Sequence, residues 1–135
     1  MRIIGIDIGE RRIGVAVSDP LGITAQGLEV IDRLTVEPLG RLKELAGQYQ
    51  PEQVVFGLPR RTDGSLGVSA EKAIAFAREV GESLALPVVP WDERLTTREA
   101  ERLLIGADVR RAKRRKVIDK VAAVLILQGY LDCRK

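Results

Sequence analysis

Three separated places in the chain carry acidic side chains that could do chemistry. Asp7 lies within the apolar run of residues 2–8, where an ionised carboxylate is costly unless a cation or several hydrogen bonds compensate it. Asp92 and Glu93 directly follow a second apolar run, so one or both carboxylates emerge at a strand end, where sites in open α/β sheets usually collect. Asp119 is the third place. If the three meet in the folded chain, their oxygens would bind one or two Mg²⁺ or Mn²⁺ ions, which prefer hard oxygen ligands.

Asp119 is distinguished by the residues that would lie beside it on a helix. Three positions share its helical face, and they hold Ala122, Ala123 and Ile126. A charged residue that faces this small apolar surface would lie close to a sheet rather than toward water. A divalent ion held there would lower the pKa of a bound water and stabilise the charge that develops on a phosphodiester during hydrolysis.

Each carboxylate also has a purely structural interpretation. Asp7 could cap a turn at residues 9–12. The acidic pair at 92 and 93 could belong to a charged loop, with Arg94 as its counter-ion. Asp119 could stabilise the macrodipole at a helix N-terminus. Both interpretations stay open for each position, although the presence of three acids in suitable surroundings favours catalysis.

The residue types that the sequence lacks exclude several kinds of catalytic and binding site. The chain contains no histidine, which excludes Ser-His-Asp and Cys-His relays and any imidazole base. Its one cysteine, Cys133, can form neither an intramolecular disulfide nor a cysteine zinc site, so a reducing cytoplasm fits best. Aromatic residues make up only 4% of the chain, and stacking of single-stranded bases on exposed rings is therefore not expected.

Basic residues are concentrated in one short window. The net charge is +3, from 22 basic and 19 acidic residues, and six of the basic residues fall between positions 110 and 116. The rest of the chain is net acidic, since 16 basic residues then face 19 acidic ones. The window predicts a patch that binds a polyanion, and the alternative is a solvated basic loop. Its members are Arg110, Arg111, Lys113, Arg114, Arg115 and Lys116.

Three further arginines are candidates for nucleic-acid contacts. Arg12 could contact a phosphate, although pairing with Glu10 in the same turn is the more ordinary explanation. Arg60 and Arg61 lie in the polar, glycine-rich segment 59–67, and they could close over a substrate or belong to a solvated loop.

Hydrophobic patterning predicts the elements that position these residues. Apolar, β-branched runs at 2–8, 13–18 and 23–31 predict three antiparallel strands at the start of the chain. A short buried strand is predicted at 53–58, and a fifth strand at 88–91, where the proline indicates a strand start or an edge strand.

Helical spacing of apolar residues predicts four helices. Thr35 and Ser69 are expected to cap the first two, and the first ends before Pro51. A third is expected from Thr96 to about residue 105, and a last one over 117–131. One side of the last helix is traced by Val117, Val121, Val124, Leu125 and Gln128.

Length and element order together predict one α/β domain over residues 1–135, a mixed sheet with helices on both faces. The most apolar stretch, 117–131, contains charged residues and is shorter than the roughly 20 residues needed to cross a bilayer. No signal-peptide pattern opens the chain. We therefore expect a soluble, cytoplasmic protein that does not enter a membrane.

Five motifs resemble one known family over nearly the whole chain. They are residues 5–9 (GIDIG), 12–19 (RIGVAVSD), 55–59 (VFGLP), 92–97 (DERLTT) and 119–123 (DKVAA). The last two are specific in combination, whereas Gly-x-Asp-x-Gly alone is weak. In these motifs the chain is similar to the YqgF-type proteins, a family of pre-16S rRNA nucleases or Holliday-junction-resolvase-like proteins within the ribonuclease-H-like superfamily.

The resemblance implies a ribonuclease-H-like sheet of five strands, the first three antiparallel, flanked by helices. It implies that Asp7, Glu93 and Asp119 are the catalytic residues and bind Mg²⁺ or Mn²⁺. Adjacent residues at a strand end point in opposite directions, so Glu93 rather than Asp92 is the expected ligand. The implied partner is nucleic acid, either precursor rRNA or branched DNA, and the protein would be a monomer or a homodimer.

Two other hypotheses compete with a metal-dependent nuclease. In one, the protein is a non-catalytic nucleic-acid-binding module whose carboxylates are structural. In the other, it is a nucleotide-binding domain of the actin and sugar-kinase type, which also begins with an Asp-x-Gly strand and a hairpin. Those folds close two domains around ATP, and 135 residues supply only one.

Overall fold

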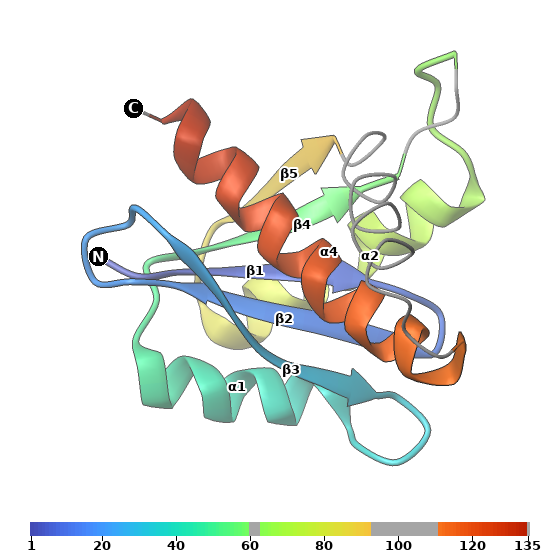
Figure 1. Cartoon of the computed structure of the whole chain (residues 1–135), viewed down its shortest axis with the longest axis horizontal. Coiled ribbons are helices and arrows are strands. Elements are labelled where there is room, and N and C mark those ends of the chain that lie inside the picture. The colour runs from blue at the N-terminus through green and yellow to red at the C-terminus, as the bar shows by residue number, and fades with distance from the viewer. Residues whose placement is uncertain (60–62, 93–110, 135) are drawn as a thin grey trace.

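The computed structural model describes residues 1–59, 63–92 and 111–134, with the backbone alone for 111–119. Five strands form one mixed sheet in the order β3-β2-β1-β4-β5 (Figure 1). Neighbours among β1, β2 and β3 are antiparallel, whereas β4 runs parallel to β1 and β5 parallel to β4. This confirms the predicted sheet with three antiparallel opening strands. The strands are β1 (Ile3–Ile8), β2 (Arg12–Ser18), β3 (Ala25–Asp32), β4 (Gln53–Leu58) and β5 (Val88–Asp92).

Helices cover both faces of the sheet, as predicted. Helices α1 (Pro38–Tyr49) and α2 (Val68–Leu84) lie against one face, and α4 (Arg111–Cys133) crosses the other obliquely (Figure 1). Helix α4 runs roughly against the direction of β1, so its first turns lie toward the carboxyl end of that strand. Among the helices of the described residues, none is long and apolar enough to cross a membrane.

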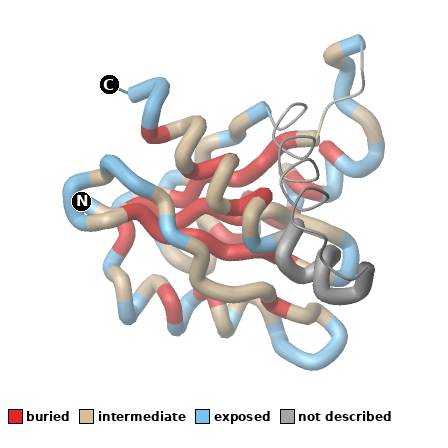
Figure 2. The backbone as a smooth tube through the Cα atoms, viewed as in Figure 1, coloured by how far each residue is buried: buried red, intermediate tan, exposed pale blue. Residues whose placement is uncertain are grey.

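Side chains alternate between the two faces of each strand, which divides the core into two clusters. Toward α1 and α2 the sheet buries large side chains, among them Ile4, Ile6 and Phe56. Toward α4 it buries a smaller cluster that includes Ile3 and Val55. Figure 2 shows the buried backbone running along the central strands between the two layers of helix.

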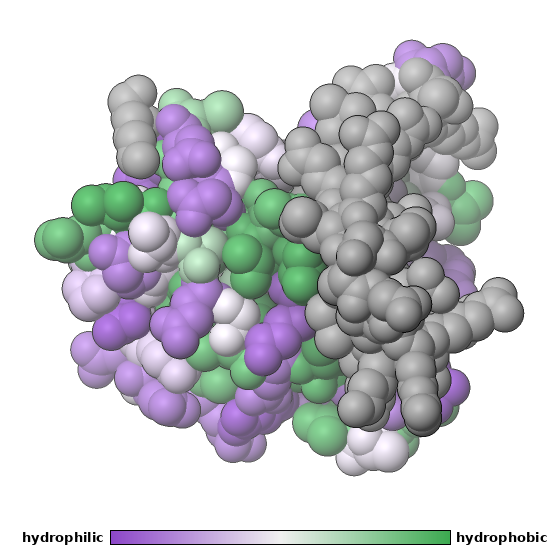
Figure 3. Space-filling model, viewed as in Figure 1, coloured by the Kyte–Doolittle hydropathy of each residue, from purple (hydrophilic) through white to green (hydrophobic). Residues whose placement is uncertain are grey.

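The buried side of α4 differs from the prediction. Of the predicted stripe, the members whose side chains are described (Val121, Val124, Leu125 and Gln128) are only partly buried, and apolar side chains are visible on the outer surface over α4 (Figure 3). The residues that pack on the sheet are instead Ala122, Ala123, Ile126, Leu127 and Leu131. Both stripes have helical spacing, so spacing alone could not choose between them. The sheet determines which stripe packs on it, because Ala123 and Leu127 fit closely over Gly5. A Cβ atom on Gly5 would lie 2.7 Å from the Leu127 Cβ and 3.3 Å from the Ala123 carbonyl oxygen.

The caps of the first two helices also differ from the prediction. Glu37, not Thr35, caps α1, because Pro38 at the first helical position sets the start of the helix and leaves the preceding residue as the cap. Ser69 does not cap α2, since Val68 already begins the helix and Gly67 holds the cap position.

Two other elements begin at unexpected residues. Strand β3 begins at Ala25, because the Asp19 carboxylate accepts hydrogen bonds from the backbone N–H groups of Ile23 and Thr24, at 2.6 and 2.9 Å, and holds them in the preceding turn. Helix α4 begins at Arg111 rather than at 117, so most of the basic window is helical and the alternative of a basic loop is wrong there.

Candidate metal site and nucleic-acid interface

Asp7 lies near the carboxyl end of β1, on the face of the sheet that α4 covers. It shares this face with Ile3 and Gly5, because residues alternate along the strand, and it is half-buried. A carboxylate in this position needs compensation by hydrogen bonds or by a cation. The position is therefore suited to holding a cation between the sheet and the helix.

Glycines flank Asp7 on both neighbouring strands. Its partner on β2 is Gly14. On β4, Phe56 pairs with Ile6, so the next residue, Gly57, lies on the other side of Asp7. No side chain therefore stands directly beside the carboxylate within the sheet. Sequence reasoning missed this pair, although a glycine inside an apolar strand is itself a sign that a ligand or another backbone approaches closely.

The carboxyl ends of the parallel strands β1, β4 and β5 form one edge of the sheet, and Asp92 ends β5 at this edge. Asp92 is exposed and lies on the α2 face with Pro90, whereas Trp91 packs in the cluster beneath α4. Asp92 therefore lies on the opposite face from Asp7. The predicted ligand Glu93 follows it in the chain and lies outside the described residues, as does the helix predicted from residue 96 to 105.

Asp119 belongs to α4, one helical turn before Ala123. Ala123 and Leu127 lie over Gly5, and α4 leads from them back toward the carboxyl end of β1 (Figure 1). Position 119 therefore continues the stripe that packs on the sheet, displaced toward the end of the strand that carries Asp7. Two of the three predicted ligands thus belong to elements that pack face to face.

Arg12 is the predicted nucleic-acid contact whose side chain is described. It begins β2 on the same face as Gly14, diagonally across from Asp7. Within the described part of the chain its side chain makes no hydrogen bond or ion pair. The alternative explanation, a pair with Glu10, is wrong, because that carboxylate instead lies 3.4 Å from Lys72 Nζ.

The basic window opens helix α4. Five of its six members, Arg111, Lys113, Arg114, Arg115 and Lys116, lie in the first turns, and the first turn has no acidic residue. Cations at a helix N-terminus oppose the macrodipole, so this end of α4 gains from a bound anion. The predicted contacts Arg60, Arg61 and Arg110 lie outside the described residues.

Among the described side chains, no group of three or more acidic, histidine or cysteine residues is arranged to hold a metal. Glu93 and Asp119 are not among those side chains, so the three-carboxylate site stays a prediction. Asp19, Glu29 and Asp63 have lowered pKa values for structural reasons. Backbone N–H groups, that of Thr24 foremost, lower the pKa of Asp19, Arg41 lowers that of Glu29, and Ser65 lowers that of Asp63.

The arrangement defines a class of protein, an α/β protein with a ribonuclease-H-like fold. A structure titled "T. thermophilus RuvC in complex with Holliday junction substrate" matches with a TM-score of 0.60, covering 99% of this chain and 96% of that chain. A second structure of Thermus thermophilus RuvC matches with a TM-score of 0.56. The sequence identities are 19% and 16%, so this likeness establishes the fold alone.

The chain belongs to the RuvX family, whose description is Holliday junction resolvase and whose model matches residues 1–133. A relative from Desulforamulus reducens is 54% identical over 98% of this chain and 97% of its own length. One from Halothermothrix orenii is 58% identical, over 98% and 95%. Both relatives carry the name "Putative pre-16S rRNA nuclease". The predicted membership of a nuclease family is confirmed.

Proposed function

We propose that the protein is a nuclease that hydrolyses phosphodiester bonds of structured nucleic acid with the help of a divalent metal ion. The observation that carries this proposal is the position of Asp7, half-buried between Gly14 and Gly57 on the face that packs against α4. A carboxylate that no side chain flanks in the sheet leaves room for an ion and for a phosphate group. Membership of the RuvX family and the names of the relatives support nuclease chemistry.

The donor set fits Mg²⁺ or Mn²⁺, because the chain offers carboxylates and has no histidine. Asp7, Glu93 and Asp119 are the proposed ligands, and Asp92 is left out because it lies on the opposite face of the sheet. When bound, the ion supplies a water of lowered pKa and stabilises charge on the phosphodiester oxygens. The protein's own part is to hold carboxylates from a strand, a strand end and a helix at one edge of the sheet.

The substrate backbone would be bound by cations next to this edge. Arg12 shares the face of Asp7 and would hold a phosphate near the bond that is cut. The basic window at the start of α4 lies within three turns of Asp119 and would hold phosphates farther along the strand. Arg60 and Arg61, which follow Pro59 in the chain, are proposed as further contacts.

Precursor 16S rRNA is the substrate we favour, because the relatives from Desulforamulus reducens and Halothermothrix orenii, each more than half identical to this chain, carry the rRNA name. Branched DNA is the alternative that the family description supports. The two differ in the assembly they need. A four-way junction requires two sites related by a two-fold axis, hence a homodimer, whereas trimming of RNA works with a monomer.

A cleavage assay with a matched pair of variants tests the proposal. Labelled precursor 16S rRNA fragments and a labelled four-way DNA junction are incubated with Mg²⁺ or Mn²⁺ and with wild type, Asp7→Asn or Asp92→Asn. We expect Asp7→Asn to lose about a hundredfold or more in rate, the scale of removing one group that stabilises transition-state charge. Asp92→Asn, the same change on the opposite face, keeps its cleavage rate. Equal cleavage by wild type and Asp7→Asn, or binding without cleavage at any metal concentration, contradicts the proposal.

A further inference from the structure

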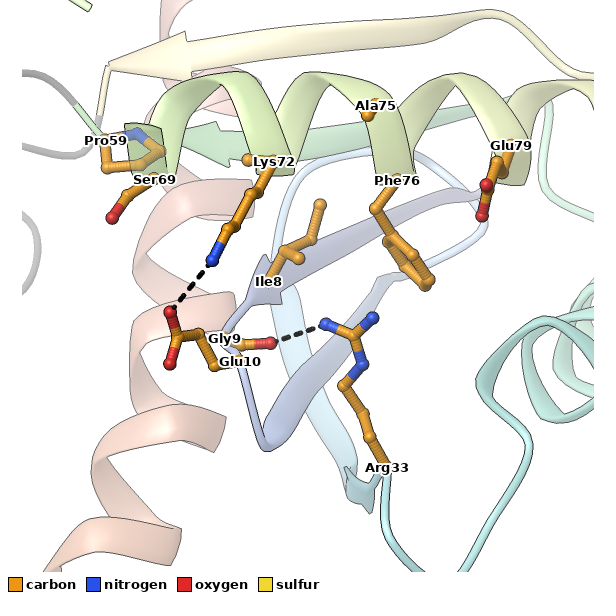
Figure 4. Close-up of a pocket in the computed structure, with 11 residues that line it drawn as sticks. Ile8, Gly9, Glu10, Arg33, Pro59, Ser69, Lys72, Ala75, Phe76 and Glu79 are labelled. Atoms are coloured by element: carbon orange, nitrogen blue, oxygen red, sulfur yellow. Dashed lines mark hydrogen bonds and ion pairs between the residues drawn. The ribbon is translucent and has the colours of Figure 1, made fainter. Parts of the chain in front are cut away.

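A cavity of about 680 Å³ opens on the α2 side of the same sheet edge (Figure 4). Its lining includes Ile8 and Gly9 at the end of β1 and residues from the first half of α2. Asp7 directly precedes Ile8, and successive strand residues face opposite sides. The cavity and the proposed metal site therefore lie on opposite faces of one strand end, where a single nucleic-acid strand passing over the edge would reach both.

Arg33 is held in this cavity, and its contacts with the described residues leave most of its hydrogen-bond donors available. Its Nη1 donates to the Gly9 carbonyl oxygen at 2.8 Å, and its Cζ lies 4.9 Å from the centroid of the Phe76 ring. Figure 4 shows the guanidinium group between these two partners. A guanidinium has five N–H donors, and contacts with the described residues use one of them. Arg33 is therefore already oriented for bidentate binding of a phosphate.

Lys72 brings a second cation to the same place. Its Nζ lies 3.4 Å from the Glu10 Oε1, and the two side chains are 65% and 86% exposed. An ion pair this exposed is weak, so a phosphate can replace the Glu10 carboxylate beside the lysine. Because Arg33 contacts Gly9 and Lys72 contacts Glu10, the two cations converge on adjacent residues of the β1–β2 turn.

The remaining polar side chains that line the cavity make its two ends different in charge. Glu79 lies seven residues after Lys72 on α2, about 10 Å along the helix. Ser69 lies one turn before Lys72, so its hydroxyl group belongs to the cationic end. An anion would therefore bind at the end next to the β1–β2 turn, away from Glu79.

We propose that Arg33 and Lys72 form a phosphate subsite that binds the backbone of the substrate nucleic acid on the α2 face, away from the bond that is cut. This inference rests on the proposed nuclease function for the nature of its ligand. On binding, the phosphate takes the place of Glu10 beside Lys72 and accepts hydrogen bonds from Arg33. The subsite makes the substrate cross the sheet edge from the α4 face to the α2 face.

Binding without cleavage tests this subsite. The affinity of a labelled four-way DNA junction and of a labelled precursor rRNA fragment is measured in EDTA over a range of salt concentrations. We expect Lys72→Gln and Arg33→Met each to weaken binding severalfold and to lower the slope of log affinity against log salt by about one. The double variant lowers the slope by about one as well, because both cations bind the same phosphate. Glu10→Gln has the opposite effect and tightens binding, because it removes the carboxylate that the phosphate must displace from Lys72.

The controls are Arg78→Gln and Glu82→Gln, which make the same changes in charge on the other side of α2, next to a different cavity. If Lys72→Gln and Glu10→Gln behave like these controls, the subsite is overturned. Both tested residues are exposed, so this pair decides the question even if Arg33→Met does not fold. The outcome is also independent of the proposed catalysis: loss of cleavage in Asp7→Asn leaves the salt slope intact, and a protein that binds without cleaving still reveals or refutes the subsite.

Discussion

The two faces of the sheet differ in what they bury. The face toward α1 and α2 packs long aliphatic and aromatic side chains, and Ile6 is wholly buried there. The face toward α4 presents Gly5 and Ala16 at its centre, and the helix packs almost directly on the backbone. Adjacent residues of one strand therefore have different roles. Ile6 belongs to the larger core cluster, whereas Asp7 places a carboxylate at the edge of the smaller cluster.

The close approach of α4 links packing to the proposed chemistry. A helix that rests on Gly5 brings position 119 toward the end of the strand that carries Asp7. A bulkier residue at the centre of this face would lift the helix and separate the two. We infer that the α1 and α2 face mainly sets stability, and that the α4 face mainly sets the geometry of the site.

Separate substitutions of the neighbouring residues Ile6 and Asp7 are the strongest test of this comparison. Ile6→Ala removes a fully buried side chain from the larger core and should cost about 2–5 kcal/mol of unfolding free energy, with cleavage per folded molecule unchanged. Asp7→Asn should do the reverse, losing cleavage while the unfolding free energy stays within about 1 kcal/mol of wild type. Urea denaturation and cleavage rates measured on the same samples check both. A large loss of stability in Asp7→Asn would contradict the division between the faces.

Two glycine substitutions on the α4 face sharpen the comparison. A Cβ on Gly5 meets the Leu127 Cβ at 2.7 Å, close to the rigid helix backbone, so Gly5→Ala should cost about 1–3 kcal/mol and reduce cleavage as well. A Cβ on Gly27 also meets an atom at 2.7 Å, but this atom is the Cε of the flexible Lys120 side chain. Gly27→Ala should therefore change both properties little. Equal losses in the two variants would show that the fit of α4 on Gly5 has no special role.

The smallest expected effect concerns an ion pair on the α1 side. The Arg41 guanidinium donates to Glu29 at 2.9 and 2.6 Å and holds the pKa of that carboxyl below its usual value of 4.5. Because the pKa of Glu29 is lower in the folded state, its ionised carboxylate stabilises the protein at pH values above the usual pKa. This contribution is lost as the pH falls through the lowered pKa. Arg41→Met should therefore lower the unfolding free energy at neutral pH by at most about 1 kcal/mol, and the difference should shrink in acid. Urea denaturation at several pH values measures this, and cleavage at neutral pH stays unchanged.

Much of the fold could be predicted from local pattern. The alternating and β-branched runs predicted five strands within about two residues of their observed bounds, and turn residues such as Asp19 separated them correctly. The starts of α1 and α4 were harder, because a helix begins where a cap or a neighbouring element allows it. Glu37 caps α1 only because its carboxylate reaches two backbone N–H groups of the first turn.

The candidate site was predictable in its residue types but not in its surroundings. Asp7 and Asp119 could be selected because a carboxylate among apolar residues needs a partner, and Glu93 because it follows a strand end and matches the family motif. The glycines that flank Asp7 come from two other strands, and their approach depends on the register of the sheet. Likewise, Arg33 reaches Gly9 and Lys72 reaches Glu10 across separations of 24 and 62 residues.

The amino-acid sequence by itself determined which elements form and which residue types are available for chemistry, because hydrophobic period, turn residues and the absence of histidine are local properties of the chain. The tertiary structure decided which stripe of α4 packs on the sheet, which faces Asp7 and Asp92 occupy and which cations converge on the β1–β2 turn. These depend on strand register and on the space left by side chains distant in sequence, and no local pattern encodes either.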